Sequence, residues 1–140
     1  MRSCPTWTLA TTPRAISNQF DGEWDYDLDW RPERGFRETP AWLDAILRGQ
    51  ARVAKGLDIQ VPILTLLSAR STLQPRWSAE MLRSDTALDV TGIARRAADL
   101  GRSCTIIRID GALHDVILSA PEVRAVAYAE IARWIAGYIT

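Results

Sequence analysis

The most informative part of this 140-residue chain is Thr105-Ile-Ile-Arg-Ile-Asp-Gly-Ala-Leu-His-Asp-Val116. The apolar run at its start is typical of a buried strand, and Gly111 predicts a turn directly after that strand. His114, the only histidine of the sequence, follows the turn. Reactive groups of α/β sheets lie at the carboxyl ends of strands, and histidine titrates near neutral pH. His114 is therefore the first candidate for a proton carrier.

A second apolar run, Val61-Pro-Ile-Leu-Thr-Leu-Leu67, predicts a parallel strand that is covered on both faces. A helix over about residues 90–100, ended by Gly101, lies between the two predicted strands. The order strand, helix, strand predicts a right-handed parallel crossover and the α/β class. Two parallel strands alone do not make a stable sheet, so we expect an incomplete domain whose sheet needs further strands.

Two further helices flank this unit. The first is expected to begin after Thr39, with Pro40 at its first position, and to end at Gly56 in a left-handed conformation. This helix is expected to have one mostly apolar face, traced by Leu43, Ile46, Leu47, Gln50, Val53 and Ala54. The last helix is expected to open with a capping box, Ser119-Ala-Pro-Glu122.

Residues 1–38 differ from the rest because they show no sustained helical or strand period. They carry Trp7, Trp24 and Trp30 among aspartates, prolines and glycines. We interpret residues 1–38 as a cap-like or lid-like irregular segment and residues 39–140 as the α/β portion. The alternation of aromatic and acidic residues over 24–30 also allows one short edge strand. Otherwise the aromatic side chains are expected to pack onto a neighbouring surface.

Composition limits the classes of function. The 17 basic and 17 acidic residues give a formal net charge of zero, which excludes a basic field for nucleic acid. No run approaches the roughly 18 apolar residues of a membrane span. Cys4 and Cys104 lie far apart, and no Cys-x-x-Cys pair occurs, so we expect neither a metal site nor a cofactor. The first residues lack the apolar run of a signal peptide, and the cytoplasm is the expected location.

Several of these features together resemble the C-terminal end of an α/β-hydrolase. They are the strand at 61–67, an acidic residue before a helix, His114 after the second strand, and a closing helix with Trp134 and Tyr138. The closest resemblance is to the branch of serine aminopeptidases, monoacylglycerol lipases and lysophospholipases. It covers about residues 40–140 and implies the last two parallel strands of that fold with their flanking helices.

The resemblance assigns roles to two side chains. The triad of this family runs in the chain order nucleophile, acid, histidine, so His114 matches the catalytic base. Alignment without a gap places the acid at Ser71, which cannot orient an imidazole electrostatically. If residues 69–84 are an insert, Asp85 becomes the acid. Asp89 is the rival candidate, and its alternative role is to cap the helix over 90–100.

The nucleophile of such a triad is not found in the sequence. No Gly-x-Ser-x-Gly stretch and no His-Gly oxyanion loop occurs. The resemblance therefore implies a fragment of an esterase-like or lipase-like serine hydrolase that is inactive alone. Its substrate in the complete domain would be a small acyl compound or ester. Self-association, or pairing with a missing N-terminal half, is expected.

Two alternatives stay open at this point. The chain could be a non-catalytic α/β interaction module that binds a partner through its tryptophan-rich N-terminal segment, because tryptophan is favoured in interface anchors. His114 could also be an ordinary structural histidine. A nucleotide-binding role has little support because no glycine-rich phosphate loop follows either strand.

Overall fold

The computed structural model describes residues 15–27, 29–30, 38–74 and 76–138. Helices alternate along the chain with two strands that form one parallel sheet, as in the α/β class. In chain order the elements are α2 (Pro40–Val53), β1 (Ile63–Ser68), the 3-10 helix η1 (Ala79–Arg83), α3 (Val90–Ala98), β2 (Cys104–Ile109), the 3-10 helix η2 (Val116–Leu118) and α4 (Pro121–Tyr138). No helix in these ranges is long and apolar enough to cross a membrane.

The two strands pair over their whole length. The register runs from Ile63 opposite Cys104 to Ser68 opposite Ile109, and one further bond joins the Ala69 N–H to the Ile109 carbonyl at 3.0 Å. Because the strands are parallel, both carboxyl ends lie at the same edge of the sheet. The loops that begin at Ala69 and Asp110 therefore start side by side.

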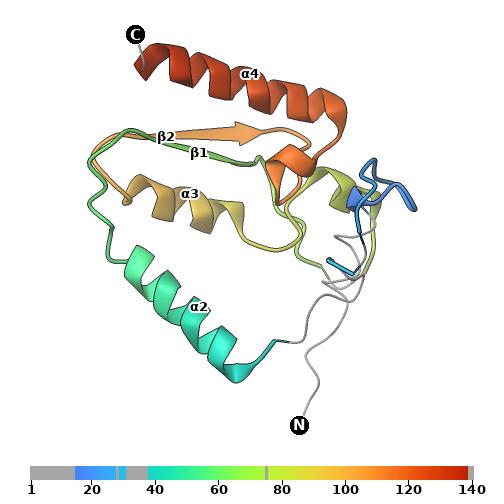
Figure 1. Cartoon of the computed structure of the whole chain (residues 1–140), viewed down its shortest axis with the longest axis horizontal. Helices are drawn as coiled ribbons and strands as arrows, with labels where there is room; N and C mark the ends of the chain where they lie inside the picture. The colour runs from blue at the N-terminus through green and yellow to red at the C-terminus, as the bar shows by residue number, and fades with distance from the viewer. Residues whose placement is uncertain (1–14, 28, 31–37, 75, 139–140) are drawn as a thin grey trace.

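The helices form layers on the two faces of this sheet. Figure 1 shows α4 on one face and α3 on the other, with α2 beyond α3. The core on the α4 side contains four buried residues, Ile109, Ala112, Val116 and Ala127. Two of these, Ala112 and Val116, belong to the segment between β2 and α4. That segment is therefore held by packing rather than left as a free surface loop.

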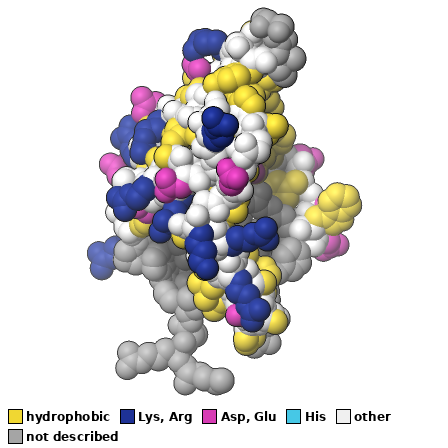
Figure 2. Space-filling view, turned by 90° about the vertical axis from the view of Figure 1, so that its left-hand side faces the viewer, with side chains coloured by type: hydrophobic (Ala, Val, Ile, Leu, Met, Phe, Trp, Pro, Cys, Tyr) yellow, Lys and Arg dark blue, Asp and Glu magenta, His cyan; other side chains and the backbone are white. Residues whose placement is uncertain are grey.

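Helix α2 begins at Pro40 as predicted and ends at Val53, three residues before the left-handed Gly56. The Thr39 hydroxyl accepts a hydrogen bond from the Trp42 N–H at 3.2 Å, and Gly56 has a φ of +81°. No residue of α2 is buried, although Ile46 and Val53 of its apolar face line a groove against α3. The side chains of Leu43, Ile46 and Leu47 are exposed. Figure 2 shows hydrophobic side chains at the surface between charged ones.

The predicted capping box of the last helix, which begins with Ser119, is wrong. Helix α4 begins at Pro121, one residue later than a cap at Ser119 requires. The Ser119 hydroxyl instead accepts the N–H of Leu113 at 2.9 Å. This backbone donor is buried and has to find an acceptor, so the tertiary contact prevails over the local cap.

The N-terminal segment packs against η2 and the first turn of α4. The Trp24 indole N–H donates to the Leu118 carbonyl at 3.2 Å, and the Arg124 guanidinium lies 4.7 Å from the centre of the Trp24 ring. Trp24 makes only an isolated bridge with Ser17, so no edge strand forms among the described residues of this segment. Trp30 is 83% exposed, whereas Trp7 and Leu28 lie outside the described residues.

Truncating the core at Ile109 tests this packing. Ile109 is 2% exposed, and we expect Ile109→Ala to lower the free energy of unfolding by about 2–5 kcal/mol. Ile135→Ala removes the same atoms from a side chain that is 42% exposed and should change that free energy by less than about 0.5 kcal/mol. Urea unfolding followed by circular dichroism measures both. Equal losses for the two variants would contradict the assignment of the core.

Candidate active site

A long loop follows β1 and brings the chain back to the end of that strand. Residues 72–84 leave the sheet, and a backbone bridge between Ser71 and Asp85 closes their loop. In this bridge the Thr72 N–H donates to the Asp85 carbonyl at 2.8 Å, and the Asp85 N–H donates to the Arg70 carbonyl at 3.0 Å. The excursion thus brings Asp85 back beside Ser71, the position that the alignment without a gap gives for the acid.

The side chain of Ser71 supports the same loop from the other side. Its hydroxyl donates to the Leu88 carbonyl at 2.8 Å and accepts the N–H of Val90, the first residue of α3, at 2.9 Å. The loop that carries Asp85 is therefore tied both to the end of β1 and to the start of α3. Sequence reasoning identified Ser71 as a departure from the family pattern and missed this structural role.

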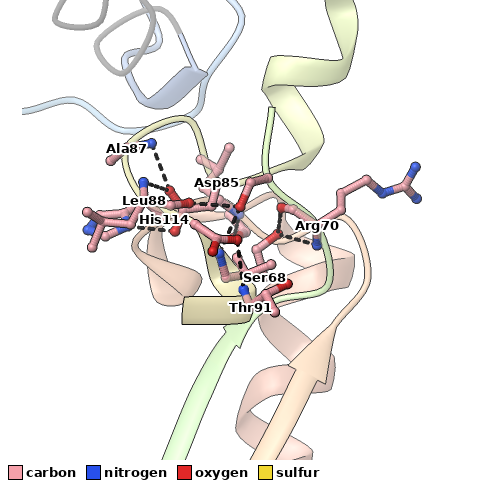
Figure 3. A network of polar contacts seen from close by, with 12 residues as sticks. Ser68, Arg70, Asp85, Ala87, Leu88, Thr91 and His114 are labelled. Atoms are coloured by element: carbon pink, nitrogen blue, oxygen red, sulfur yellow. Dashed lines mark hydrogen bonds and ion pairs between the residues drawn. The ribbon is translucent and has the colours of Figure 1, made fainter. Parts of the chain in front are cut away.

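The Asp85 carboxylate is buried and fully engaged. The residue is 1% exposed. Its Oδ1 accepts the N–H groups of Ala87 and Leu88, both at 2.8 Å, and its Oδ2 lies 2.8 Å from Nδ1 of His114 (Figure 3). The two backbone bonds make a turn that fixes the plane of the carboxylate. Asp85 therefore presents one oxygen to the imidazole in a set direction.

His114 reaches this oxygen from the loop after β2. Gly111 has a φ of +75°, a conformation that side chains with a Cβ rarely adopt, and the following Ala112 is completely buried. The turn leads the chain across the end of the sheet toward Asp85. The His114 side chain is 45% exposed, so one ring nitrogen is anchored while part of the ring faces solvent.

Each of these two groups stabilises the charged form of the other, which shifts the pKa of both. Burial by itself raises the pKa of Asp85, but the hydrogen bond from His114 and the N–H groups of Leu88 and Ala87 outweigh it, so the pKa lies below its ordinary value. The hydrogen bond to Asp85 raises the pKa of His114, and partial burial opposes this only in part. An ionised carboxylate can only accept hydrogen bonds, so Nδ1 of His114 carries the hydrogen. The neutral ring then has its lone pair on Nε2.

Asp89, the other candidate for the acid, caps a helix instead. Its Oδ1 accepts the N–H of Thr91 and its Oδ2 accepts the N–H of Gly92, both at 3.0 Å. Asp89 is thus the N-cap of α3, as its alternative role predicted. Between the two aspartates, Asp85 is the one that contacts the imidazole.

No described serine takes the position of a nucleophile. In the described part of the chain the only hydrogen-bond partner of His114 is Asp85. The Ser68 hydroxyl donates to the Arg70 carbonyl at 3.0 Å. Ser103 follows Gly101 by two positions, but it precedes β2 at the amino end of the strand, where its hydroxyl lies 3.3 Å from that of Tyr138.

An apolar recess adjoins the imidazole. It has a volume of about 380 Å³, and its lining combines His114 and Asp115 with Leu66, Val116, Ile117 and Ile131. No three of the histidine, cysteine, aspartate and glutamate side chains in the described ranges are grouped so as to hold a metal ion. The position of His114, paired with Asp85 beside an apolar surface, is suited to proton transfer.

Comparison with known proteins gives no relative: no family model, curated protein or solved structure matches the chain. The geometry of Asp85, His114 and the residues that bond to them is the evidence on function.

Asp85→Asn tests the electrostatic coupling. Because the sequence contains one histidine, its ring protons can be followed by NMR without ambiguity as the pH is varied. We expect Asp85→Asn to lower the pKa of His114, since the neutral amide no longer stabilises the imidazolium. Asp89→Asn is the matched control, because asparagine caps a helix as well as aspartate does, and it should leave this pKa in place. An unchanged pKa in Asp85→Asn would contradict the ion pair.

Proposed function

We propose that this chain carries the acid and the base of a catalytic triad in an α/β-hydrolase that cleaves ester or acyl substrates. The observation that carries the proposal is the 2.8 Å contact between the buried Asp85 carboxylate and Nδ1 of His114. The two residues follow adjacent parallel strands at one edge of the sheet, and the acid precedes the histidine in the chain. This is the order in which the last two members of an α/β-hydrolase triad occur.

The proposed roles follow from the geometry of the pair. His114 Nε2 would take the proton of a nucleophilic hydroxyl as it attacks the ester carbonyl, and would return that proton to the leaving group. Asp85 would hold the ring in the Nδ1–H tautomer and stabilise the imidazolium, without taking the proton itself. The partial exposure of the ring supports this division, because Nδ1 is occupied while the proton-accepting side needs access to the nucleophile.

The nucleophile and the oxyanion donors would come from a segment that this sequence does not contain. A serine nucleophile in this fold needs the strained turn of Gly-x-Ser-x-Gly, which does not occur here. The sheet gives an independent reason to propose further segments. Parallel strands occur almost only in larger, covered sheets, whereas β1 and β2 pair only with each other in the described ranges. We therefore propose that the 140 residues alone hydrolyse esters poorly or not at all.

An extended chain tests the proposal directly. The reading frame upstream of Met1, followed across a frameshift if necessary, is expected to encode Gly-x-Ser-x-Gly. The extended protein should react with a fluorophosphonate probe at that serine, and the 140-residue chain should not. In the extended protein Asp85→Asn should lower kcat/KM for a p-nitrophenyl ester by about 10⁴-fold, as for other triad aspartates, with Asp89→Asn close to wild type.

The pH dependence of the same reaction supplies a second readout. The base must be neutral, so kcat/KM should rise with pH through the pKa of His114, which lies above the ordinary value of 6.5. An upstream sequence without a nucleophile elbow would refute the proposal. Labelling of a serine within the 140 residues would refute the assignment of the nucleophile to another segment.

A second candidate function is binding to a partner protein without catalysis. It is favoured by the 83% exposure of Trp30 and by the uncovered apolar face of α2, which borders a groove of about 760 Å³ against α3. Exposed apolar patches of this kind mark interaction sites.

Size-exclusion chromatography with light scattering, together with thermal melting, separates the two candidates. An independent binding module should give a single species that melts cooperatively. Soluble aggregates without a cooperative transition would favour the fragment of a hydrolase instead.

A further inference from the structure

A buried hydroxyl supports the loop of the candidate base. Ser119 is 1% exposed, and its Oγ accepts the N–H of Leu113 at 2.9 Å. This bond spans six residues and closes the loop in which His114 directly follows Leu113. The Ser119 N–H also donates to the carbonyl of Val116, the first residue of η2, at 3.3 Å, which ties the backbone of Ser119 to this 3-10 helix.

The loop is held at several points, and among the described residues Ser119 makes the side-chain bond to the loop backbone that lies nearest to His114 in the sequence. Ala112 and Val116 anchor it to the core. The Trp24 indole fixes the Leu118 carbonyl from outside. The Ser119 bond acts on the peptide group between Ala112 and Leu113, one residue before His114. It therefore governs the direction in which the Cα–Cβ bond of His114 leaves the backbone.

The acid cannot compensate for an error in this direction. Both oxygens of Asp85 are engaged, and the two N–H groups at Oδ1 hold the carboxylate in place. The alignment of Nδ1 with Oδ2 therefore depends on the histidine loop. A small displacement of this loop weakens the hydrogen bond, because hydrogen-bond strength falls steeply with distance and angle.

We propose that Ser119 is a positioning residue that sets the orientation of His114 toward Asp85. The catalytic meaning of this role rests on the proposed function, whereas the geometry stands without it. Removal of the hydroxyl leaves the buried N–H of Leu113 without an acceptor, and the loop has to shift to satisfy it. The His114–Asp85 hydrogen bond then lengthens or is lost.

Ser119→Ala tests the proposal in the full 140-residue chain. The readout is the pKa of His114 from NMR titration, which a general loss of stability does not change. We expect this pKa to move down toward the ordinary value in Ser119→Ala. The control is Ser17→Ala, which removes another buried hydroxyl, one that accepts the N–H of Gln19 at 3.2 Å, and it should leave the pKa of His114 raised. A folded Ser119→Ala variant with the wild-type pKa would overturn the proposal.

A second measurement needs no variant and covers the case in which Ser119→Ala does not fold. The Leu113 amide of the unmodified chain should exchange its hydrogen slowly with solvent, as a buried and bonded donor does. Exchange as fast as that of exposed loop amides would overturn the proposal. Neither readout involves ester hydrolysis, so an inactive extended chain would refute the proposed function and leave the role of Ser119 standing.

Discussion

The hydrogen bond between Asp85 and His114 is the constraint on which the rest of the site depends. It joins two loops that leave adjacent parallel strands, 29 positions apart in the sequence. The carboxylate of Asp85 is held in place because two backbone N–H groups donate to its other oxygen. The direction of the His114 side chain depends on its loop, which contains the turn at Gly111 and the hydrogen bond to the hydroxyl of Ser119. Burial opposes both shifts, but the hydrogen bond between the two groups lowers the pKa of Asp85 and raises the pKa of His114, which suits them to separate roles.

The hydrophobic side chains of the described residues are packed unevenly. Helix α4 and the loop before it enclose a small core at the carboxyl end of β2. Helix α2, in contrast, buries none of its residues, although its sequence has a clear apolar face. Such a face gains free energy only when it is covered, at roughly 25 cal/mol for each Å² removed from water. The chain thus satisfies the packing around its acid and base better than the packing farther from them.

Much of this arrangement could be predicted from the sequence. The two apolar runs gave both strands, and Thr39, Gly56 and Asp89 marked helix ends through local chemistry that does not depend on tertiary contacts. Predictions failed where a tertiary contact competed with a local one. Ser119 reads as a helix cap, but a buried N–H at Leu113 takes its hydroxyl. The exposure of the apolar face of α2 could not be predicted from periodicity, because periodicity shows which side of a helix is apolar and not what covers it. The contact of Asp85 with His114 followed from the family pattern only if residues 69–84 were an insert, and the bridge between Ser71 and Asp85 closes such an excursion.

The position of the hydrogen on the imidazole shows whether His114 pairs with Asp85 as a general base does with its acid. A general base paired with an aspartate needs the hydrogen on Nδ1 and a free lone pair on Nε2. The ¹⁵N chemical shifts of the single histidine, recorded well above its pKa, distinguish the two tautomers. We expect a protonated Nδ1 and an unprotonated Nε2, and a change of this pattern when Asp85 is replaced by alanine. A ring that carries its hydrogen on Nε2, or a pattern that does not depend on Asp85, would show that Asp85 does not pair with His114 in this way.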